Sequence, residues 1–315
     1  MKAFIGLSAR IGSDPLLVQT SSGNTSLKLA GMLWIKASGR WLARAMDEGS
    51  FVPLPLAELH SRLGRNEDVS ASGGPSIETA MHAVISRRVV IHVHSVNTIA
   101  WAVRRDGERQ LSERLAGLNW RWIPYEASGL PLAQAVKAAV TASPKTNVFV
   151  LANHGLVVCG DDCASAENLL ARVESCLSVS PRSEPQFSDP VTARILQGGV
   201  LFPCQAMFLG TKPLRLTDSL RDTLTDIQGS VLTGLLQVVR RIDESAPIRY
   251  LTETEIADLL CRDIHGYLQS VEKNAVKAAG PSVFHPEELQ RQVPVLPELV
   301  VNRWEIRRCS LQRRR

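Results

Sequence analysis

Three histidines stand where the chain could bring them to one point. His92 and His94 lie at the end of an apolar, β-branched run, Val89–Val93, and His154 follows a second such run, Val148–Ala152. Side chains two apart on a strand share a face, and in α/β sheets the reacting groups gather where strands end. Three imidazole nitrogens with one open position form a catalytic zinc site. We therefore predict that the three histidines are metal ligands, although either motif alone would more often be a coincidence.

Glu78 is the candidate acid and base. It lies in the segment Ser76–Thr79, which is expected to open a helix after Pro75 with Ser76 as the N-cap. A carboxylate at a helix start and close to a cation stays ionised, and it can move a proton at a carbon next to a coordinated carbonyl. The alternative is an ordinary first-turn glutamate that the helix dipole favours. His82, one helical turn later, could face the same cavity.

Two short polar segments flank a predicted β-hairpin and could bind an anion. They are Ser22–Ser26 and Ala37–Gly39. Their backbone N–H groups and hydroxyls suit a phosphate or a carboxylate, and Lys36 could add a positive charge to the same pocket. Taken alone, both segments are also explained as turns, and an exposed lysine on a strand is common.

The first half of the chain alternates short β-type runs with helical patterns. Ala30-Gly31 separates the two strands of the hairpin. The other predicted elements are the strands Val89–Val93 and Val148–Ala152 and the helices Pro131–Ala142 and Ala164–Leu177. Strands with covering helices predict an α/β layered domain.

Beyond residue 178 the pattern changes. Ser178–Pro190 is rich in proline and polar residues, which is typical of a linker. After it we expect a smaller α+β or helical appendage with helices over Leu220–Ile242 and Glu253–Val271. The predicted organisation is therefore a catalytic domain over 1–180, an appendage over 190–280 and a poorly ordered basic tail over 281–315.

The net charge of +5 comes from 36 Lys plus Arg against 31 Asp plus Glu. Six arginines and one glutamate lie in Asn302–Arg315, so this tail alone carries the whole excess. A neutral body argues against a nucleic-acid-binding surface, which needs clustered basic groups on ordered elements. The apolar runs fall short of the roughly 18 to 20 residues that cross a bilayer, and the N-terminus does not have the pattern of a secretory signal. We expect a cytoplasmic protein that binds neither nucleic acid nor a membrane.

The order of these motifs resembles the class II aldolase/adducin family over about residues 1 to 178. The matching segments are Gly23–Ser26, Met32–Gly39, Pro75–Glu78 with His82, His92–His94 and Asn153–Leu156. The lysine before Ala37-Ser38-Gly39 looks most like the branch that includes the aldolase part of bifunctional aldolase/short-chain dehydrogenases. The resemblance implies a three-layer α/β/α sandwich around a mainly antiparallel sheet, usually in a cyclic homotetramer with active sites between subunits.

The resemblance also implies roles for single residues. His92, His94 and His154 match the histidines that hold Zn²⁺, for which another divalent transition metal could substitute, and Glu78 matches the glutamate that moves the proton. The residues that match phosphate-binding positions are Asn24, Ser38, Gly39 and Ser76. The implied activity is that of a zinc-dependent aldolase, a lyase that cleaves a sugar-derived ketose or ketose 1-phosphate through an enediolate on the metal.

The chain departs from the family pattern at two places, and two other functions are open as well. Ile77 stands where the fuculose-phosphate aldolases have a second serine, which removes one phosphate hydroxyl. No tyrosine occurs between His94 and Pro124, the stretch that holds their proton donor, although Tyr250 or Tyr267 could substitute. The same site could also decarboxylate a 3-oxo sugar acid. The third possibility is a non-catalytic, adducin-like interaction module.

Overall fold

A seven-stranded mixed sheet forms the centre of the computed structural model, which describes residues 1–69, 74–182, 189–217, 220, 223–261 and 264–276. The strand order is β3-β2-β1-β4-β7-β6-β5, and every neighbouring pair is antiparallel except β5 and β6. The strands are β1 Asn24–Leu29, β2 Met32–Lys36, β3 Phe51–Pro55, β4 Val89–Val93, β5 Trp120–Ile123, β6 Val148–Leu151 and β7 Gly155–Gly160.

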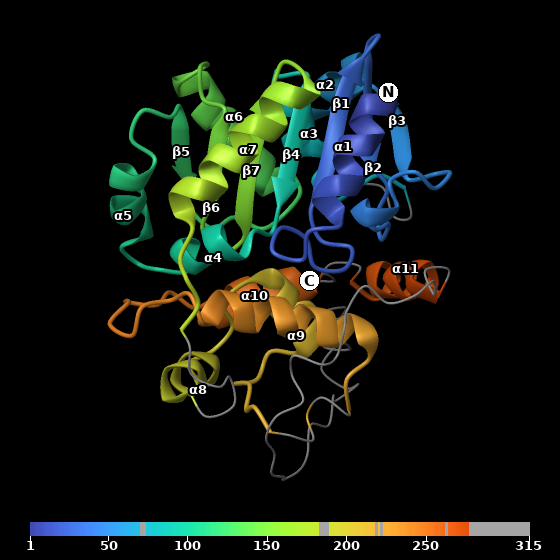
Figure 1. The fold of residues 1–315 in the computed structure, drawn as a ribbon. Helices are drawn as coiled ribbons and strands as arrows, with labels where there is room; N and C mark the ends of the chain where they lie inside the picture. The colour runs from blue at the N-terminus through green and yellow to red at the C-terminus, as the bar shows by residue number, and fades with distance from the viewer. Residues whose placement is uncertain (70–73, 183–188, 218–219, 221–222, 262–263, 277–315) are drawn as a thin grey trace, which may run out of the picture.

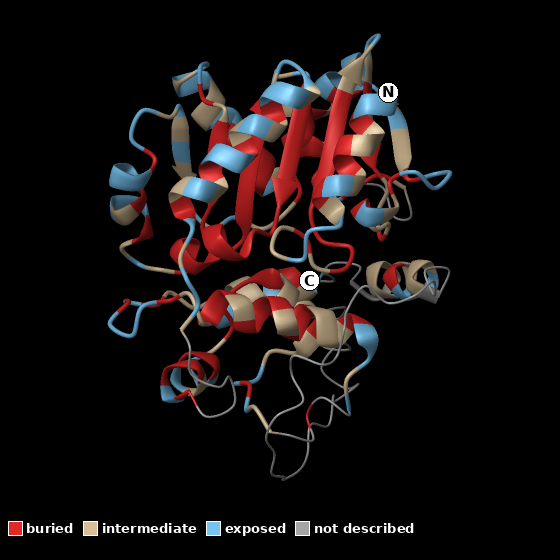
Figure 2. Cartoon of the chain, viewed as in Figure 1, coloured by how far each residue is buried: buried red, intermediate tan, exposed pale blue. Residues whose placement is uncertain are grey.

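Helices cover both faces of the sheet, which confirms the predicted α/β/α sandwich (Figure 1). One core includes residues of α1 Lys2–Gly12, α4 Val96–Ala102, α5 Gly107–Arg114 and α7 Cys163–Leu177. The core on the other face includes residues of α2 Leu56–Gly64, α3 Thr79–Val84 and α6 Leu130–Ala142. A short 3₁₀ turn, η1 Leu42–Arg44, follows the hairpin. The central strands are buried, while the helices turn exposed residues outward (Figure 2).

The alternation of side chains along β4 determines which face of the sheet His92 points to. Val89, Ile91 and Val93 belong to the first core, whereas Val90 belongs to the core that contains α3. Because side chains alternate along the strand, His92 points with Val90 toward α3. The histidine therefore faces the helix that follows Glu78.

The hairpin of β1 and β2 forms as predicted. Ala30 and Gly31 have φ values of +52° and +75°, as a two-residue type I′ turn requires. Strand β3 was not expected, since Pro53 and Pro55 argue against a strand. It lies at the edge of the sheet, where a strand pairs on one side only and a proline without an N–H can be tolerated.

Several predicted helix boundaries were wrong. Helix α3 begins at Thr79 with Glu78 as its N-cap, because the Ser76 hydroxyl accepts hydrogen bonds from Asn24 and from the Glu78 N–H. The helix predicted over Leu220–Ile242 is the shorter α9, Asp226–Val239, which starts at a capping box formed by Thr225 and Gln228. In place of one helix over Glu253–Val271 there are two, α10 Glu253–Leu260 and α11 Ile264–Val276.

The described residues from 190 to 276 form a C-terminal helical layer beyond one end of the strands (Figure 1). It consists of α8 Pro190–Gln197, the π-helix η2 Gln205–Leu209, α9, α10 and α11, and none of its described residues belongs to a named strand. Val96, Ile99 and Val103 of the α4 region share a core with Leu232 and Leu235 of α9. The appendage is therefore helical and packs directly on the sheet domain. The division at 180 and 190 stays a prediction, and the predicted basic tail over 281–315 lies outside the described residues.

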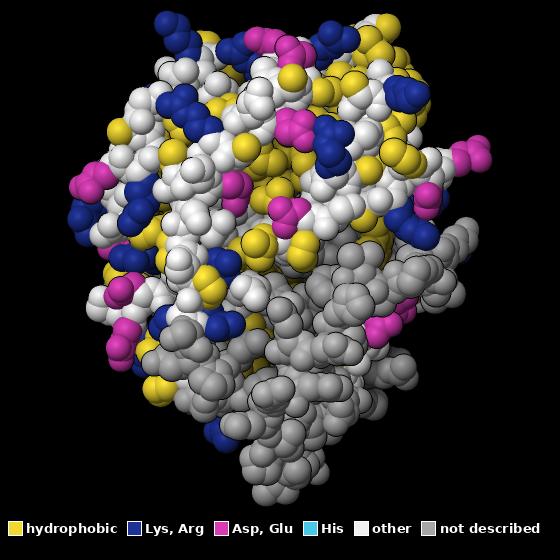
Figure 3. Space-filling view, in the orientation of Figure 1, with side chains coloured by type: hydrophobic (Ala, Val, Ile, Leu, Met, Phe, Trp, Pro, Cys, Tyr) yellow, Lys and Arg dark blue, Asp and Glu magenta, His cyan; other side chains and the backbone are white. Residues whose placement is uncertain are grey.

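Charges on one face of the molecule are mixed rather than clustered. On the face in Figure 3, acidic and basic side chains are interspersed with apolar ones. None of the described helices combines the length and the apolar character that a membrane crossing requires.

Candidate metal centre

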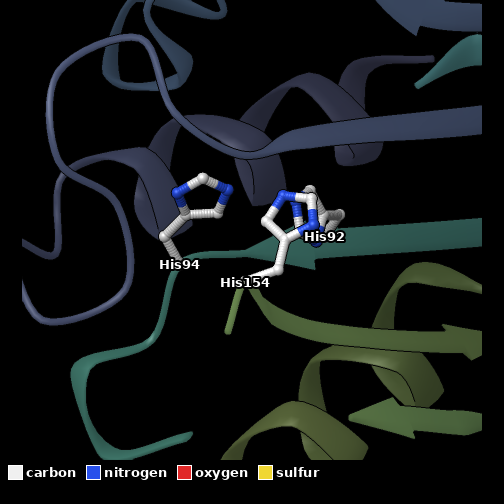
Figure 4. Close-up of side chains that lie close together, drawn as sticks. All are labelled: His92, His94 and His154. Atoms are coloured by element: carbon white, nitrogen blue, oxygen red, sulfur yellow. The ribbon is translucent and has the colours of Figure 1, made fainter. Parts of the chain in front are cut away.

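His92, His94 and His154 meet where the sheet borders the C-terminal helical layer. One potential ligand atom of each lies within 4.8 Å of the other two. The side chains come from β4, from the residue just after it and from the β6–β7 turn, and their rings gather at the end of β4 (Figure 4). Ring centroids are 4.9 to 5.1 Å apart in edge-on arrangements. The structure thus brings together the three residues that the sequence pattern singles out.

The hydrogen bonding and the lowered pKa values of the histidine rings suit them to bind a cation. His92 donates from Nδ1 to the Leu156 carbonyl (3.1 Å), which leaves Nε2 buried with no hydrogen-bond partner in the described structure. Burial lowers the pKa of His154 to about 4, against the opposing effect of Glu78, and lowers the pKa of His94 well below its usual value. Neutral imidazoles and an orphaned ring nitrogen are what coordination of a metal requires. These residues therefore fit a divalent ion.

The turn Asn153-His154-Gly155 holds the third histidine in place. Asn153 has φ +52°, a conformation that asparagine tolerates better than most residues. Its Nδ2 donates to the carbonyls of Leu201 and Arg249, each at 2.8 Å, and its Oδ1 accepts from Arg249. The turn that carries His154 is therefore fixed to the C-terminal helical layer.

Gly155 allows β7 to approach β4 closely. A Cβ atom at this position would lie 2.5 Å from the Val93 carbonyl oxygen and 3.4 Å from ring carbons of His92 and His94. No real Cβ makes so short a contact with a carbonyl oxygen. Glycine is therefore required here by the packing of β7 against β4 and the two histidines.

The carboxylate of Glu78 lies against this cluster. Its Oε2 is 3.3 Å from His92 Nε2, and its Oε1 is 3.2 Å from His154 Nε2. Asn24 donates to Oε2 (2.7 Å) and Ser128 to Oε1 (3.2 Å). Burial would raise the pKa of Glu78, but the positive charge that His92 and His154 carry when protonated, together with the Asn24 hydrogen bond, holds it well below its usual range. The group is thus an ionised, oriented base.

The predicted substrate-binding residues fall into two groups. Asn24 and Ser76 are buried beside Glu78, and Asn24 donates to both Ser76 Oγ (3.1 Å) and Glu78. Both amide hydrogens of Asn24 are therefore used within the protein. Whether either residue also contacts a substrate stays a prediction.

Lys36, Ser38 and Gly39 form the second group. Lys36 is buried, and its Nζ donates to the carbonyls of Ser21 (2.6 Å) and Arg40 (2.8 Å). Burial lowers the pKa of Lys36 to about 7, while the charge of nearby Glu78 opposes the shift. Helix α11 lies over this loop: Asn274 donates to the Gly39 carbonyl, and a Cβ on Gly39 would meet Ser270 Oγ at 2.3 Å. Sequence reasoning did not foresee this cover.

Other residues near the site were missed or left undecided. Ser128 carries no recognisable motif, and Cys204, whose Sγ lies 3.3 Å from His94 Nδ1, is 110 residues away along the chain. The hydroxyls of Tyr267 and Ser21 are hydrogen-bonded (2.9 Å). The negative charge of Glu78 contributes to the raised pKa of Tyr267. Tyr250 instead donates to the Ile195 carbonyl in the helical layer. Only Tyr267 of these two tyrosines adjoins the site.

Comparison with known proteins places this site in a family. The "Uncharacterized oxidoreductase YuxG" of Bacillus subtilis (strain 168) is 26% identical over 212 residues, which make up 60% of this chain but only 30% of that protein. Two of the similar solved structures serve as examples. The N-terminal class II aldolase domain of a Thermoplasma acidophilum protein is 26% identical, with a TM-score of 0.47, over 55% of this chain and 90% of that one. L-fuculose-1-phosphate aldolase from Thermus thermophilus is 17% identical, with a TM-score of 0.41, over 56% and 93%.

The family comparison covers most of the sheet domain and the three histidines with Glu78. Residues 8–180 match the sequence profile of the class II aldolase and adducin N-terminal domain. This range includes the three histidines and Glu78. The chain belongs to the class II aldolase and adducin N-terminal domain family.

Proposed function

We propose that the protein is a metal-dependent aldolase, a lyase that cleaves a carbon–carbon bond of a sugar-derived ketose. One observation carries the proposal: three buried histidines converge on one point, and the ionised carboxylate of Glu78 lies within 3.3 Å of two of them. Membership of the family supports the same reading. The proposed metal ligands are His92, His94 and His154, and Zn²⁺ is the first choice because nitrogen ligands suit it.

Because a catalyst accelerates a reaction in both directions, the roles of the residues can be described for the condensation direction. A bound cation would supply a Lewis acid beside the ketone oxygen. Glu78 removes a proton from the carbon next to that ketone, the new bond forms to the aldehyde carbon, and the aldehyde oxygen takes up a proton. We propose Tyr267 as that proton donor, because it is the tyrosine that adjoins the site through the Ser21 hydroxyl. Burial raises the pKa of its phenol, which therefore stays protonated. Cleavage runs through the same transfers in reverse.

We propose a small sugar-derived ketose as the substrate. Lys36, Ser38 and Gly39 are the proposed contacts to an anionic group, and Asn24 and Ser76 are proposed contacts beside Glu78. Ile77, which is 40% exposed next to Glu78, offers no hydroxyl to a phosphate, so ketoses and their 1-phosphates should be compared directly. A cytoplasmic homotetramer is the proposed setting, and light scattering of the purified protein tests the assembly.

Metal analysis and product analysis test the proposal together. The purified protein should hold about one divalent ion per chain, and His92→Ala should lose both the ion and the activity. Glu78→Gln should keep the ion but lose exchange of the substrate C–H proton with solvent. Full activity of a metal-free preparation would refute the proposal. Release of CO₂ from a 3-oxo sugar acid, without aldehyde from any ketose, would replace it with a decarboxylase, and a chain that holds no metal would point to an interaction module.

A further inference from the structure

His82 lies beside the candidate site without facing the metal cluster. It is fully buried in α3, and both of its ring nitrogens are hydrogen-bonded. Nδ1 lies 2.7 Å from Ser26 Oγ, and Nε2 lies 2.5 Å from Asn24 Oδ1. Asn24 in turn donates from Nδ2 to Glu78 Oε2 at 2.7 Å. A continuous chain of short hydrogen bonds therefore runs from Ser26 through His82 and Asn24 to the carboxylate.

The register of the sheet places this chain. Asn24 pairs directly with His92 across β1 and β4, and Ser26 pairs with Val90. Asn24 and Ser26, two residues apart on β1, therefore face the α3 side together with His92. His82, one helical turn after Glu78, reaches both of them at once.

The chemistry of the groups fixes the direction of every hydrogen bond. An ionised carboxylate only accepts, so Asn24 must turn its NH₂ toward Glu78 and its carbonyl oxygen toward His82. Nε2 of His82 must then carry the proton, and Nδ1 of the neutral ring accepts from the Ser26 hydroxyl. Burial, together with the charge of nearby Lys28, keeps the pKa of His82 well below its usual value, which agrees with a neutral ring.

We propose that His82 is a positioning residue for the proton transfer that the proposed aldolase function assigns to Glu78. Its Nε2–H holds the Asn24 amide in the one orientation that presents a donor to the carboxylate. Without that proton, the Asn24 carbonyl oxygen loses this donor in a buried place, and the amide can shift away from the carboxylate to find another. The carboxylate then leaves its position 3.2–3.3 Å from His92 and His154. The inference rests on the proposed function.

Matched substitutions separate positioning from packing. Gln can keep a donor near the place of Nε2, whereas Leu has a similar size and no donor. We expect His82→Leu to lower kcat by about 10- to 100-fold, the usual cost of removing an outer-shell partner, with KM and metal content nearly unchanged. His82→Gln should recover most of that loss. His60→Gln is the control, because His60 contacts the same helix through the Ala83 carbonyl (3.0 Å) and does not reach Asn24. Equal losses in the Leu and Gln variants would overturn the inference, as would an unchanged kcat in the Leu variant.

A readout without turnover keeps the two proposals apart. In metal-free protein labelled with ¹⁵N-histidine, NMR should show His82 as the neutral Nε2–H tautomer, with a proton resonance shifted downfield by the short bond to Asn24. Asn24→Ala should move that resonance upfield. If His82 proves to be the Nδ1–H tautomer, the positioning inference fails even for an active enzyme. If the tautomer is as expected and no ketose is cleaved, the geometry stands and the proposed aldolase function fails.

Discussion

Replacing Gly155 with alanine is the sharpest test of how the candidate metal centre is built. The new Cβ would lie 2.5 Å from the Val93 carbonyl oxygen, whereas carbon–oxygen contacts between neighbouring strands are about 3.3 Å or longer. Both contact partners belong to backbone in the paired strands β4 and β7, so neither can move alone. The same Cβ would press on ring carbons of His92 and His94 at 3.4 Å.

The expected magnitude follows from these contacts. Overpacking in a core costs about 1–3 kcal/mol, and a backbone clash belongs at the upper end of that range. A domain with a free energy of unfolding of about 5–15 kcal/mol survives this loss. Because the strands must separate at the point where both histidines sit, we also expect metal affinity to fall by about 10- to 100-fold, as when ligand-orienting neighbours are lost.

Two measurements check the Gly155→Ala variant. Denaturant unfolding of the metal-free protein gives the change in stability, and competition with a chelator gives the metal affinity. Gly229→Ala in α9 is the control, since a Cβ there meets nothing within 4 Å and alanine favours a helix by up to about 1 kcal/mol. A Gly155→Ala protein with unchanged stability and unchanged metal affinity would refute the reasoning.

Three further substitutions test the roles of single residues. Asn153→Ala removes three hydrogen bonds and strains a residue at φ +52°, so denaturant unfolding should show a loss of about 2–4 kcal/mol; a loss below about 1 kcal/mol would contradict the anchoring role. Tyr267→Phe should change stability by about 1 kcal/mol or less and lower condensation by at least about 100-fold, and unchanged rates would exclude it as the donor. The hydrogen bond from Arg104 lowers the pKa of Asp106 to about 2, so its stabilisation is present above about pH 4 and is lost as the pH falls through about 2. Asp106→Asn should then cost about 1 kcal/mol near neutral pH after solvent screening and nothing in strong acid, and an equal cost at both pH values would argue against the ion pair.

The parts of the fold that could be predicted are those that local patterns specify. The Ala30-Gly31 turn defines the hairpin, and the apolar runs at β4 and β6 define two buried interior strands. Strand β3 was missed because its prolines argue against a strand, and only its edge position makes them acceptable. The start of α3 was misplaced because Ser76 has the side chain of an N-cap, but its hydroxyl accepts from Asn24, 52 positions earlier, and from the Glu78 N–H, and the helix begins only at Thr79.

The residues of the candidate site likewise fall into those that a local sequence pattern identifies and those that it does not. His92, His94 and His154 could be identified because each lies in or next to a strong strand pattern and strand ends converge in α/β sheets. Contacts from the C-terminal helical layer could not be predicted from the sequence. No local pattern links Cys204 to His94 across 110 residues, or Tyr267 to Ser21 across 246 residues. Such pairs are set by how helices pack, which depends on the sum of many weak contacts.

Asn24 shows what register adds to a motif. From the sequence alone it stands in a polar loop next to a hairpin, and contact with a substrate is the natural expectation. Pairing of β1 with β4 places it opposite His92, where both amide hydrogens are taken by Ser76 and Glu78 and its oxygen by His82. A shift of one residue would turn Asn24 to the other face of the sheet and leave Glu78 without this donor. The register of a single strand pair therefore decides whether the proposed base is oriented, which is why residues of the right types at the right spacing do not by themselves define the site.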